Sequence, residues 1–522
     1  MSRAAVLVLL ALAVPAQAAR KENAVARSLR PSIRAGAGNI RLTVLHTNDI
    51  HGWVMSRPAY FHEADPKRPV GGAAALAAYV KKVKGPKLVL DGGDWFQGTP
   101  EGTLQGGRAL AEVFNAVGYD ALAVGNHDFD NGEDNLQGII KAMRAPVLCA
   151  NVYRSAGQRA PEFQPWLVKE IAGVKVGLFG LLTTNMKRLS FAENIAGLAF
   201  RRGVDEAKDA VATLRGQGAT VIIALSHQGL EPPGVTTYEA DRFLAQNVEG
   251  IDLIVGGHSH TALKEGERDS VHGTLIVQAG SELARVGEAV LEIDPKTKRV
   301  LKSSARLKDL WPDEVGSDPA LAQVVAKLAG EVSAVYDVVV GTAAAPLLRN
   351  RDKESSLGDW MADCERQWAG ADLALHNGGG IRADIPAGPV TLRGIFDLMP
   401  FENRVVKLVM KGKDVKNVLD HGVGMARIAQ VSGAEVSFRR KAPEGGRLVA
   451  VRLAGRDLVD ESTYTVATID FLVQGGDGYT AFDSAVSTDF TKTKLRDVLQ
   501  ACVQKRPLLT IPPAGRLVPL GD

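Results

Sequence analysis

Residues 42–52 read LTVLHTNDIHG, an apolar run that ends in a cluster of polar side chains beside a glycine. The same arrangement recurs four times along the chain: KLVLD is followed by GGD, DALAVG by NHDFD, TVIIALS by HQG, and DLIVGG by HSH. Continuous apolar runs of this length, separated by helical segments, predict buried strands of an α/β fold. The crevice beyond the carboxyl ends of such strands is the usual binding site. We therefore expect the polar clusters to meet in one cavity.

These clusters hold a mixed set of oxygen and nitrogen donors. One cluster alone is more often a turn or a helix cap, but five at equivalent strand ends favour a shared metal site. The candidate ligands are Asp49, His51, Asp94, Asn126, His227, His258 and His260. Such a set is too large for one tetrahedral zinc ion, and it suits two divalent ions that share a carboxylate. The histidines favour Zn, Mn, Fe or Co, and a water held between two such ions becomes a nucleophile near neutral pH.

The chain begins with the features of a secretory signal peptide. Arg3 precedes an apolar run over residues 4–15, and AQA at residues 16–18 is typical of a cleavage site. We expect a signal peptide over residues 1–18 and a flexible basic leader over residues 19–40; a buried N-terminal helix is the alternative. No other apolar run is long enough to span a membrane. These features predict a secreted protein without a membrane anchor, which is periplasmic in a Gram-negative source.

The composition is that of a globular protein. The chain has 522 residues, of which 45% are hydrophobic and 23% charged, and its net charge is +3. Most of the excess positive charge lies in the leader, and a near-neutral remainder excludes binding of a nucleic acid polymer as the main role. The three cysteines, Cys149, Cys364 and Cys502, allow one disulfide bond at most. We expect a monomer or a weak oligomer.

The length predicts two or three domains. Asp318 is a good N-cap residue and Pro319 a good first residue for a helix that runs to about residue 336. Before this helix the pattern is that of one α/β unit, and after it a second α/β unit follows. We expect domains over residues 41–315 and 337–520, with an interdomain helix or hinge over residues 316–336.

The order of the motifs resembles that of a known superfamily. Asp-x-His, Gly-Gly-Asp, Gly-Asn-His-Asp, Ser-His and Gly-His-x-His follow one another as in the calcineurin-like metallophosphoesterases. The forms TNDIHG, GNHDFDNG and GGHSH look like those of the bacterial and extracellular 5′-nucleotidases, which include periplasmic UDP-sugar hydrolases. The resemblance covers about residues 41–520. It implies a four-layer α/β/β/α sandwich, followed by a C-terminal α/β nucleotide-recognition domain joined to it by a linker helix.

The resemblance also implies a role for each residue of the metal site. One ion would be held by Asp49, His51, Asp94 and His260, and the other by Asp94, Asn126, His227 and His258, so that Asp94 bridges them. His127 aligns with the catalytic histidine of the family, and Asp130 aligns with the acid that orients it. A cationic imidazole beside the phosphorus would stabilise charge in the transition state, and a carboxylate would keep the imidazole charged.

The second unit contains a candidate nucleotide pocket. Residues 376–382 read HNGGGIR after a short apolar strand, and consecutive glycines allow a ligand to approach the backbone closely. The resemblance implies that Phe401 and Phe471 sandwich the base and that Asp477 contacts the ribose. Because every base has a π-face, stacking would accept many nucleotides. The candidate substrate-binding residues are Arg351, Asn377, Gly379, Arg382, Phe401, Phe471 and Asp477, with Lys353 as the alternative to Arg351.

These observations predict an exported, two-metal phosphohydrolase that removes the 5′-phosphate from nucleoside monophosphates and could also cleave UDP-sugars or other nucleotides. A 2′,3′-cyclic nucleotide phosphodiesterase or a sulfur-oxidation hydrolase would share the fold with a different substrate. A nucleotide- or metal-binding protein without catalysis is the alternative from another class. The full ligand set together with His127 argues against it, because a binding protein does not need an activated water.

Overall fold

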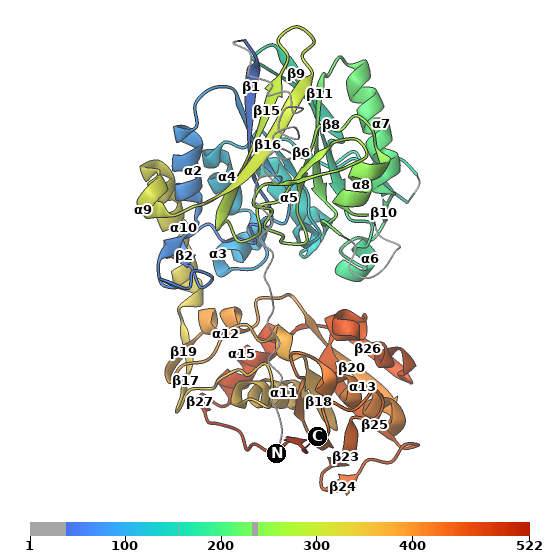
Figure 1. Cartoon of the computed structure of the whole chain (residues 1–522). Helices are drawn as coiled ribbons and strands as arrows, with labels where there is room; N and C mark the ends of the chain where they lie inside the picture. The colour runs from blue at the N-terminus through green and yellow to red at the C-terminus, as the bar shows by residue number, and fades with distance from the viewer. Residues whose placement is uncertain (1–37, 156, 232–238, 522) are drawn as a thin grey trace, which may run out of the picture.

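The computed structural model describes residues 38–155, 157–231 and 239–521, and Figure 1 shows them as two bodies, one above the other. The predicted signal peptide and almost all of the predicted basic leader lie outside these residues. Within the described ranges, no helix is both long enough and apolar enough to cross a bilayer.

Two six-stranded sheets form the centre of the first body, and each contains a run of parallel strands. One sheet has the order β16 (Val300–Asp309), β15 (Arg285–Ile293), β1 (Ile40–Thr47), β4 (Lys87–Asp91), β5 (Ala121–Ala123) and β6 (Val147–Leu148). The other has the order β13 (Glu267–Arg268), β14 (Leu275–Val277), β12 (Leu253–Gly256), β11 (Val221–His227), β9 (Val174–Leu182) and β8 (Trp166–Ile171). Strands β1, β4, β5 and β6 are parallel to one another, as are β9, β11, β12 and β14. Their carboxyl ends therefore lie together at one edge, where the polar clusters follow.

Apolar side chains on both faces of each sheet produce four layers. In β1, Val44 faces the core between the two sheets, whereas the next residue, Leu45, faces the helices outside; successive strand residues point to opposite faces. The helices outside the first sheet are α2 (Ala73–Lys82), α4 (Leu110–Val117), α5 (Glu133–Ala142) and α10 (Pro319–Tyr336). Outside the second sheet lie α7 (Gly203–Gly216) and α8 (Asp241–Asn247). The predicted α/β/β/α sandwich is confirmed.

Shorter elements complete this body at its edges. They are α3 (Pro100–Thr103), α6 (Met186–Leu189), α9 (Pro312–Val315), β2 (Arg57–Pro58), β3 (Pro69–Val70), β7 (Val152–Arg154) and β10 (Leu198–Phe200).

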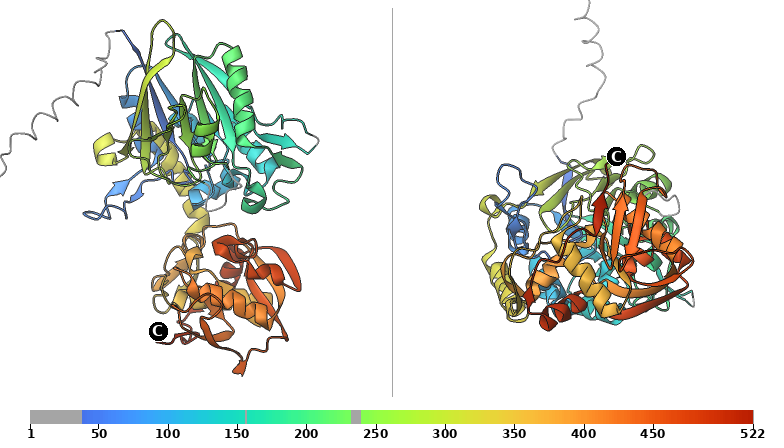
Figure 2. Two further views of the ribbon diagram at one scale, coloured as in Figure 1. Left: turned by 45° about the vertical axis from the view of Figure 1, so that its right-hand side comes forward. Right: turned by 90° about the horizontal axis from the view of Figure 1, so that it is seen from below.

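Helix α10 connects the two bodies (Figures 1 and 2). It begins as predicted: the Asp318 side chain accepts a hydrogen bond from the main-chain N–H of Leu321 at 3.0 Å, and Pro319 opens the first turn. Lys81 of α2 forms an ion pair with Asp318. Leu321 and Val332 are buried in the core that α2 and α4 also line. The helix is therefore packed onto the first body along its length rather than being a bare connector.

The second body contains a five-stranded sheet and two smaller sheets around one core. The large sheet has the order β21 (Gln430–Ser432), β18 (Leu373–His376), β25 (Thr463–Ile469), β20 (Arg404–Lys411) and β26 (Ser487–Lys494). The smaller sheets are β19 (Gly388–Thr391), β17 (Val339–Ala343) and β27 (Leu508–Leu509), and β24 (Arg456–Asp457), β23 (Leu448–Leu453), β22 (Ala434–Phe438) and β28 (Leu517–Pro519). The helices are α11 (Ser356–Ala369), α12 (Leu392–Leu398), α13 (Gly412–Gly424), α14 (Asp470–Val473) and α15 (Leu495–Lys505).

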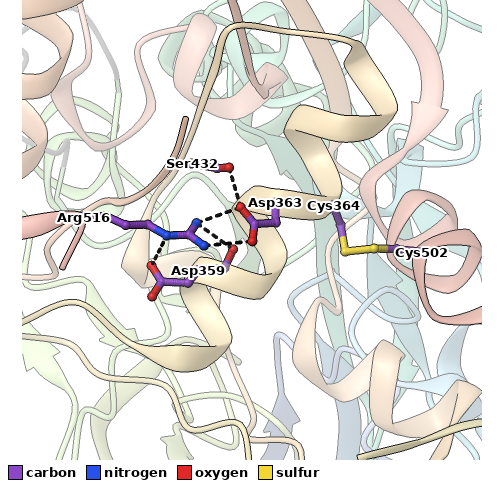
Figure 3. Close-up of a disulfide and its surroundings, with 6 residues drawn as sticks. All are labelled: Asp359, Asp363, Cys364, Ser432, Cys502 and Arg516. Atoms are coloured by element: carbon purple, nitrogen blue, oxygen red, sulfur yellow. Dashed lines mark hydrogen bonds and ion pairs between the residues drawn. A yellow bond between two sulfur atoms is a disulfide. The ribbon is translucent and has the colours of Figure 1, made fainter. Parts of the chain in front are cut away.

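A disulfide bond joins two helices of the second body. Cys364 of α11 is bonded to Cys502 of α15, and Cys149 is a buried free thiol in the first body. Figure 3 shows Asp363, the neighbour of Cys364, paired with Arg516. Two guanidinium nitrogens of Arg516 donate to the two carboxylate oxygens of Asp363 at 2.8 Å each. The disulfide and this ion pair together hold α15 and the C-terminal strand against α11.

Candidate active site

The predicted metal ligands converge at the carboxyl edge of the two parallel runs. Among the described residues, two groups bring ligand atoms within 4.8 Å of one another: Asp49, His51 and His260 form one group, and Asp94, His227 and His258 form the other. These groups match the division that the sequence resemblance implies. Asn126, the remaining candidate, is buried directly after the β5 strand end.

Asp94 lies between the two groups. Its Oδ2 atom is 3.1 Å from Nε2 of His227 in its own group and 3.9 Å from Nε2 of His51 in the other. Asp49 also faces both groups, with Oδ1 at 3.4 Å from Nε2 of His260 in its own group and 4.0 Å from Nε2 of His227 in the other. A carboxylate at the position of Asp94 can face ions in both groups.

The backbone at the site is unusual. Five of the ligands have positive φ angles, a conformation that few residues other than glycine adopt: Asp49 (50°), His51 (50°), Asp94 (62°), His258 (73°) and His260 (53°). Gly93, beside Asp94, has φ +95°, and a Cβ there would lie 2.8 Å from both Gly125 N and His227 Nδ1. Such conformations cost of order 1–3 kcal/mol each and persist where the surrounding fold imposes them. The strand-end glycines and the strained ligands together bring the donor atoms inward.

The residues present fit a pair of divalent ions. Oδ1 of Asn126 is buried and has no hydrogen-bond partner, although buried polar atoms are normally paired, and Nε2 of His227 is buried beside the Asp94 carboxylate at 3.1 Å without forming a hydrogen bond to it. Both atoms have a lone pair that a cation could use. Nδ1 of His227 lies 2.7 Å from the carbonyl oxygen of Gly92, and Nδ1 of His51 lies 2.8 Å from that of Gln97. A carbonyl can only accept, so Nδ1 carries the proton in each ring and Nε2 remains available for a metal.

A buried carboxylate behind the site was not among the predicted residues. The Asp128 side chain accepts hydrogen bonds from the main-chain N–H groups of Asp94 (3.0 Å), Trp95 (2.8 Å) and Gly125 (2.7 Å). Burial, followed by the charge of Asp94, raises the pKa of Asp128 well above its usual range. Asp128 joins the turns after β4 and β5, and so fixes the relative positions of Asp94 and Asn126. The motif GNHDFD contains this residue, but an aspartate in a turn gives no sign of which N–H groups it binds.

His127 lies at the rim of the metal site and is oriented by Asp130. Its Nδ1 atom is 2.8 Å from Oδ2 of Asp130, and its main-chain N–H donates to Oδ1 of Asp94 at 2.8 Å. The His127 side chain is 34% exposed, so a substrate can reach it. Burial lowers the pKa of His127, but the carboxylates of Asp130 and Asp94 outweigh that effect and raise it to about 10. Bound cations would oppose this rise by adding positive charge nearby.

One cavity of about 350 Å³ joins the rim of the metal site to the second body. From the first body it is lined by Gln97, Asn126, His127 and Asp130, together with Arg188, Leu189, Ser190 and Phe191. From the second body it is lined by Asn377, Gly379, Gly380, Arg382, Phe401, Glu402, Asn403, Arg427, Ile469, Asp470, Phe471, Gln474 and Asp477. Residues of the two bodies that are between 186 and 380 positions apart in the sequence thus form a single binding space.

Six of the seven predicted substrate-binding residues line this cavity. The Phe471 side chain is 42% exposed, as expected for an aromatic ring that faces a binding space rather than the core. Phe401 is partly buried, and the Arg382 guanidinium lies over its ring at 5.6 Å from the centroid. Nδ2 of Asn377 donates to Oδ2 of Asp477 at 2.7 Å, so these two polar side chains form one unit.

Arg351, the seventh, does not line the cavity, and neither does Lys353. Burial lowers the pKa of Arg382, and so do the charges of Arg427, Arg351 and Arg349. Arg351 therefore lies in the same cationic neighbourhood.

Two other arginines do line the cavity, Arg188 of α6 and Arg427 of the loop before β21. Neither follows a motif that points to a ligand, and each reaches the cavity only through the tertiary fold. The sequence contained no signal that could have identified them.

Comparisons with known proteins agree with this geometry. A family model described as "Calcineurin-like phosphoesterase" matches residues 42–262, and one described as "5'-nucleotidase, C-terminal domain" matches residues 339–484. Protein UshA of Yersinia enterocolitica is 30% identical over 517 residues, which cover 89% of this chain and 91% of that protein. A 5'-nucleotidase of Vibrio cholerae is 29% identical over 521 residues and covers 88% of this chain and 90% of its own length.

A solved structure extends the similarity to three dimensions. The crystal structure of a 5'-nucleotidase precursor from Thermus thermophilus is 30% identical, covers 92% of this chain and 100% of that chain, and has a TM-score of 0.73. Both bodies are included in these matches. The chain therefore belongs to the 5′-nucleotidase family and is a nucleotide phosphohydrolase, a hydrolase that joins a calcineurin-like phosphoesterase domain to a 5′-nucleotidase C-terminal domain.

Proposed function

We propose that this family member removes the 5′-phosphate from nucleoside monophosphates. The observation that supports this most directly is the single cavity, which is lined by Asn126 and His127 of the first body and by Phe401 and Phe471 of the second. A nucleotide has a phosphate at one end and a flat base at the other. The first body offers polar groups for the phosphate, and the second body offers aromatic rings for the base. Both bodies would therefore take part in the reaction.

The proposed catalytic residue is His127, held in place by Asp130. With its Nδ1–H donated to Asp130, the imidazole directs Nε2 away from that carboxylate, and in its cationic form Nε2 carries a proton. It would donate this proton as a hydrogen bond to a phosphoryl oxygen and offset the negative charge that develops in the transition state. The carboxylate of Asp130 keeps the ring oriented and favours its charged form.

The family implies divalent metal ions, and we propose that two are bound. Asp49, His51 and His260 would hold one, His227 and His258 with Asn126 the other, and Asp94 would face both. Histidine-rich donor sets suit Zn, Mn or Co. These ions would supply the Lewis acidity that hydrolysis of a phosphate ester needs.

The second body would recognise the nucleoside. Phe401 and Phe471 offer two aromatic faces for a base, and stacking of this kind contributes about 1–3 kcal/mol per base. The Asn377–Asp477 unit presents a carboxylate and an amide, which suit the hydroxyl groups of a ribose. We further propose that residues 41–315 form the catalytic domain and residues 337–520 the substrate-binding domain. The helix over residues 316–336 would connect the two domains and act as the hinge between them. Among the residues that the structure describes, no contact indicates a fixed base preference, and UDP-sugars could also be accepted.

We also propose that the protein works outside the reducing cytosol, after cleavage of a signal peptide. The Cys364–Cys502 bond supports this, since stable disulfides form in oxidising compartments such as the periplasm.

The test is hydrolysis of a panel of substrates, with the products identified by chromatography, after the metal-depleted protein has been refilled with Zn, Mn or Co. The panel contains AMP, IMP, UMP, a UDP-sugar, a 2′,3′-cyclic nucleotide and a thiosulfonate. We expect the nucleoside 5′-monophosphates to be hydrolysed fastest. Hydrolysis of the cyclic nucleotide or the thiosulfonate alone would assign the chain to one of the other activities that this fold supports.

A further inference from the structure

Gln97 contacts both a proposed metal ligand, His51, and the turn at Pro400 and Phe401 (the base-binding turn). Its main-chain carbonyl accepts a hydrogen bond from Nδ1 of His51 at 2.8 Å, and its side-chain Nε2 donates to the carbonyl oxygen of Pro400 at 2.8 Å. Pro400 directly precedes Phe401 in the second body. Gln97 is only 3% exposed; its hydrogen bond with His51 is buried, and its hydrogen bond with Pro400 is partly buried. One buried residue therefore links the proposed metal site to the proposed base pocket.

The chain around Gln97 is packed tightly on the His51 turn. The main-chain N–H of Gly52 donates to the carbonyl of Trp95 at 2.7 Å, and the Thr99 hydroxyl donates to the carbonyl of Gly52 at 2.8 Å. Gly98 has φ +143°, and a Cβ there would lie 2.7 Å from the main-chain oxygen of His51. A displacement of residues 97–99 would therefore move or release His51.

The same segment has a second attachment to the other body. Glu101 of α3 pairs with Arg393 of α12 at 2.9 Å, and Arg393 also pairs with Asp337, which follows α10, at 2.6 Å. Residues 97–101 thus hold the second body at two points and the metal-ligand turn at a third. Of these residues, only Gln97 contacts the base-binding turn and a metal ligand at the same time.

We propose that Gln97 is a positioning residue that couples occupancy of the base pocket to metal binding at His51. This proposal rests on the proposed function, because it requires that Phe401 receives a base. A bound base would hold the Pro400–Phe401 turn against the Gln97 amide and so fix the segment whose carbonyl orients His51. The Nδ1–H bond to that carbonyl keeps Nε2 of His51 directed at the metal position. Coupling between two sites is reciprocal, so a ligand in the base pocket raises metal affinity by the factor by which metal raises the affinity of that ligand.

Adenosine is the ligand for the test, because it has a base and a ribose but no phosphate that could bind the metal directly. The affinity of the metal-depleted protein for Mn(II) is measured by calorimetry with and without saturating adenosine. In the parental protein, adenosine tightens Mn(II) binding about three- to tenfold, the range expected for one buried neutral hydrogen bond. In Gln97→Ala this effect disappears, while Mn(II) binding without adenosine is unchanged because the main-chain carbonyl is retained.

Two further variants separate the possible outcomes. Gln97→Glu keeps the shape but replaces the amide donor by an acceptor facing the Pro400 carbonyl, so it also loses the coupling. Gln164→Ala removes an exposed glutamine whose Nε2 donates to the carbonyl of Trp166, and it keeps the coupling. If adenosine binds to the parental protein without changing Mn(II) affinity, the coupling is overturned and the nucleotidase assignment stands. If Gln97→Ala weakens Mn(II) binding without adenosine, the residue only supports His51.

Phe401→Ala distinguishes a failure of the coupling from a failure of the proposed function. Loss of adenosine binding in this variant, with Mn(II) binding retained, places the base at Phe401. If adenosine does not bind to the parental protein at all, the assignment of the base pocket is wrong. The proposed coupling, which depends on that assignment, is then wrong as well.

Discussion

Nδ1 of His127 lies 2.8 Å from Oδ2 of Asp130, three residues later in the same short turn. Both residues line the cavity that reaches the second body, and neither belongs to the two ligand groups. The arrangement separates the proposed metal ligands from the proposed catalytic residue, so the two roles can be tested independently.

Substitution His127→Ala should leave the metal content near two ions per chain and reduce turnover of AMP about 10²–10³-fold. The reason is that His127 donates to the transition state without holding a metal, and removal of one such donor has a cost of this size. Metal content is measured by atomic emission and turnover by phosphate release. His272→Ala, at an exposed histidine outside the cavity, is the matched control and should behave as the parental protein. Loss of metal in His127→Ala would show that this histidine is a ligand.

Substitution Asp94→Asn should be the most damaging single change at the metal site. The amide has nearly the same shape, but it lacks the negative charge that would offset repulsion between cations held by the two ligand groups. We expect about one of the two ions to be lost and turnover to become nearly undetectable. Atomic emission and phosphate release again provide the readouts. A variant that kept two ions and the parental rate would show that the Asp94 carboxylate does not hold both ions.

Substitution of both Cys364 and Cys502 by serine should destabilise the second body by about 2–4 kcal/mol. The disulfide closes a loop with a sequence separation of 138 residues, and bonds that close long loops restrict the unfolded chain most. Urea unfolding followed by circular dichroism measures the change. Cys149→Ser alone leaves this bond intact and is the control for loss of a thiol. Equal midpoints for the double variant and the parental protein would mean that the bond adds no stability.

The metal site was predictable because its residues follow strands whose ends the fold must bring together. The apolar runs before Asp49, Asp94 and Asn126 are parallel neighbours in one sheet, and those before His227 and His258 are neighbours in the other. Parallel pairing alone places their carboxyl ends at one edge. The continuous apolar runs likewise predicted buried strands of an α/β fold, whereas the four layers were implied only by the family resemblance.

Other parts of the site depend on contacts that no local pattern indicates. Gln97 and Arg427 reach the cavity because two bodies meet there, and no motif beside them in the sequence indicates a ligand. The pairing of Cys364 with Cys502 follows from the packing of α11 against α15, whereas three cysteines alone allow several pairings. Asp128 owes its role to three main-chain N–H groups that the turn geometry brings to it.

The central claim is that one cavity joins a phosphate-hydrolysing centre to a base-binding pocket, and substrates with and without a base test it most directly. Phe401→Ala and Phe471→Ala should each weaken binding of AMP by about 1–3 kcal/mol, so that KM rises roughly tenfold or more. The same variants should hydrolyse bis-p-nitrophenyl phosphate at nearly the parental rate, because that substrate offers no base and the metal centre is unchanged. Phe490→Ala, an exposed phenylalanine of β26 outside the cavity, should affect neither substrate. An equal fall on both substrates, or no change on either, would contradict the account, since the two rings would then be packing residues rather than the base pocket.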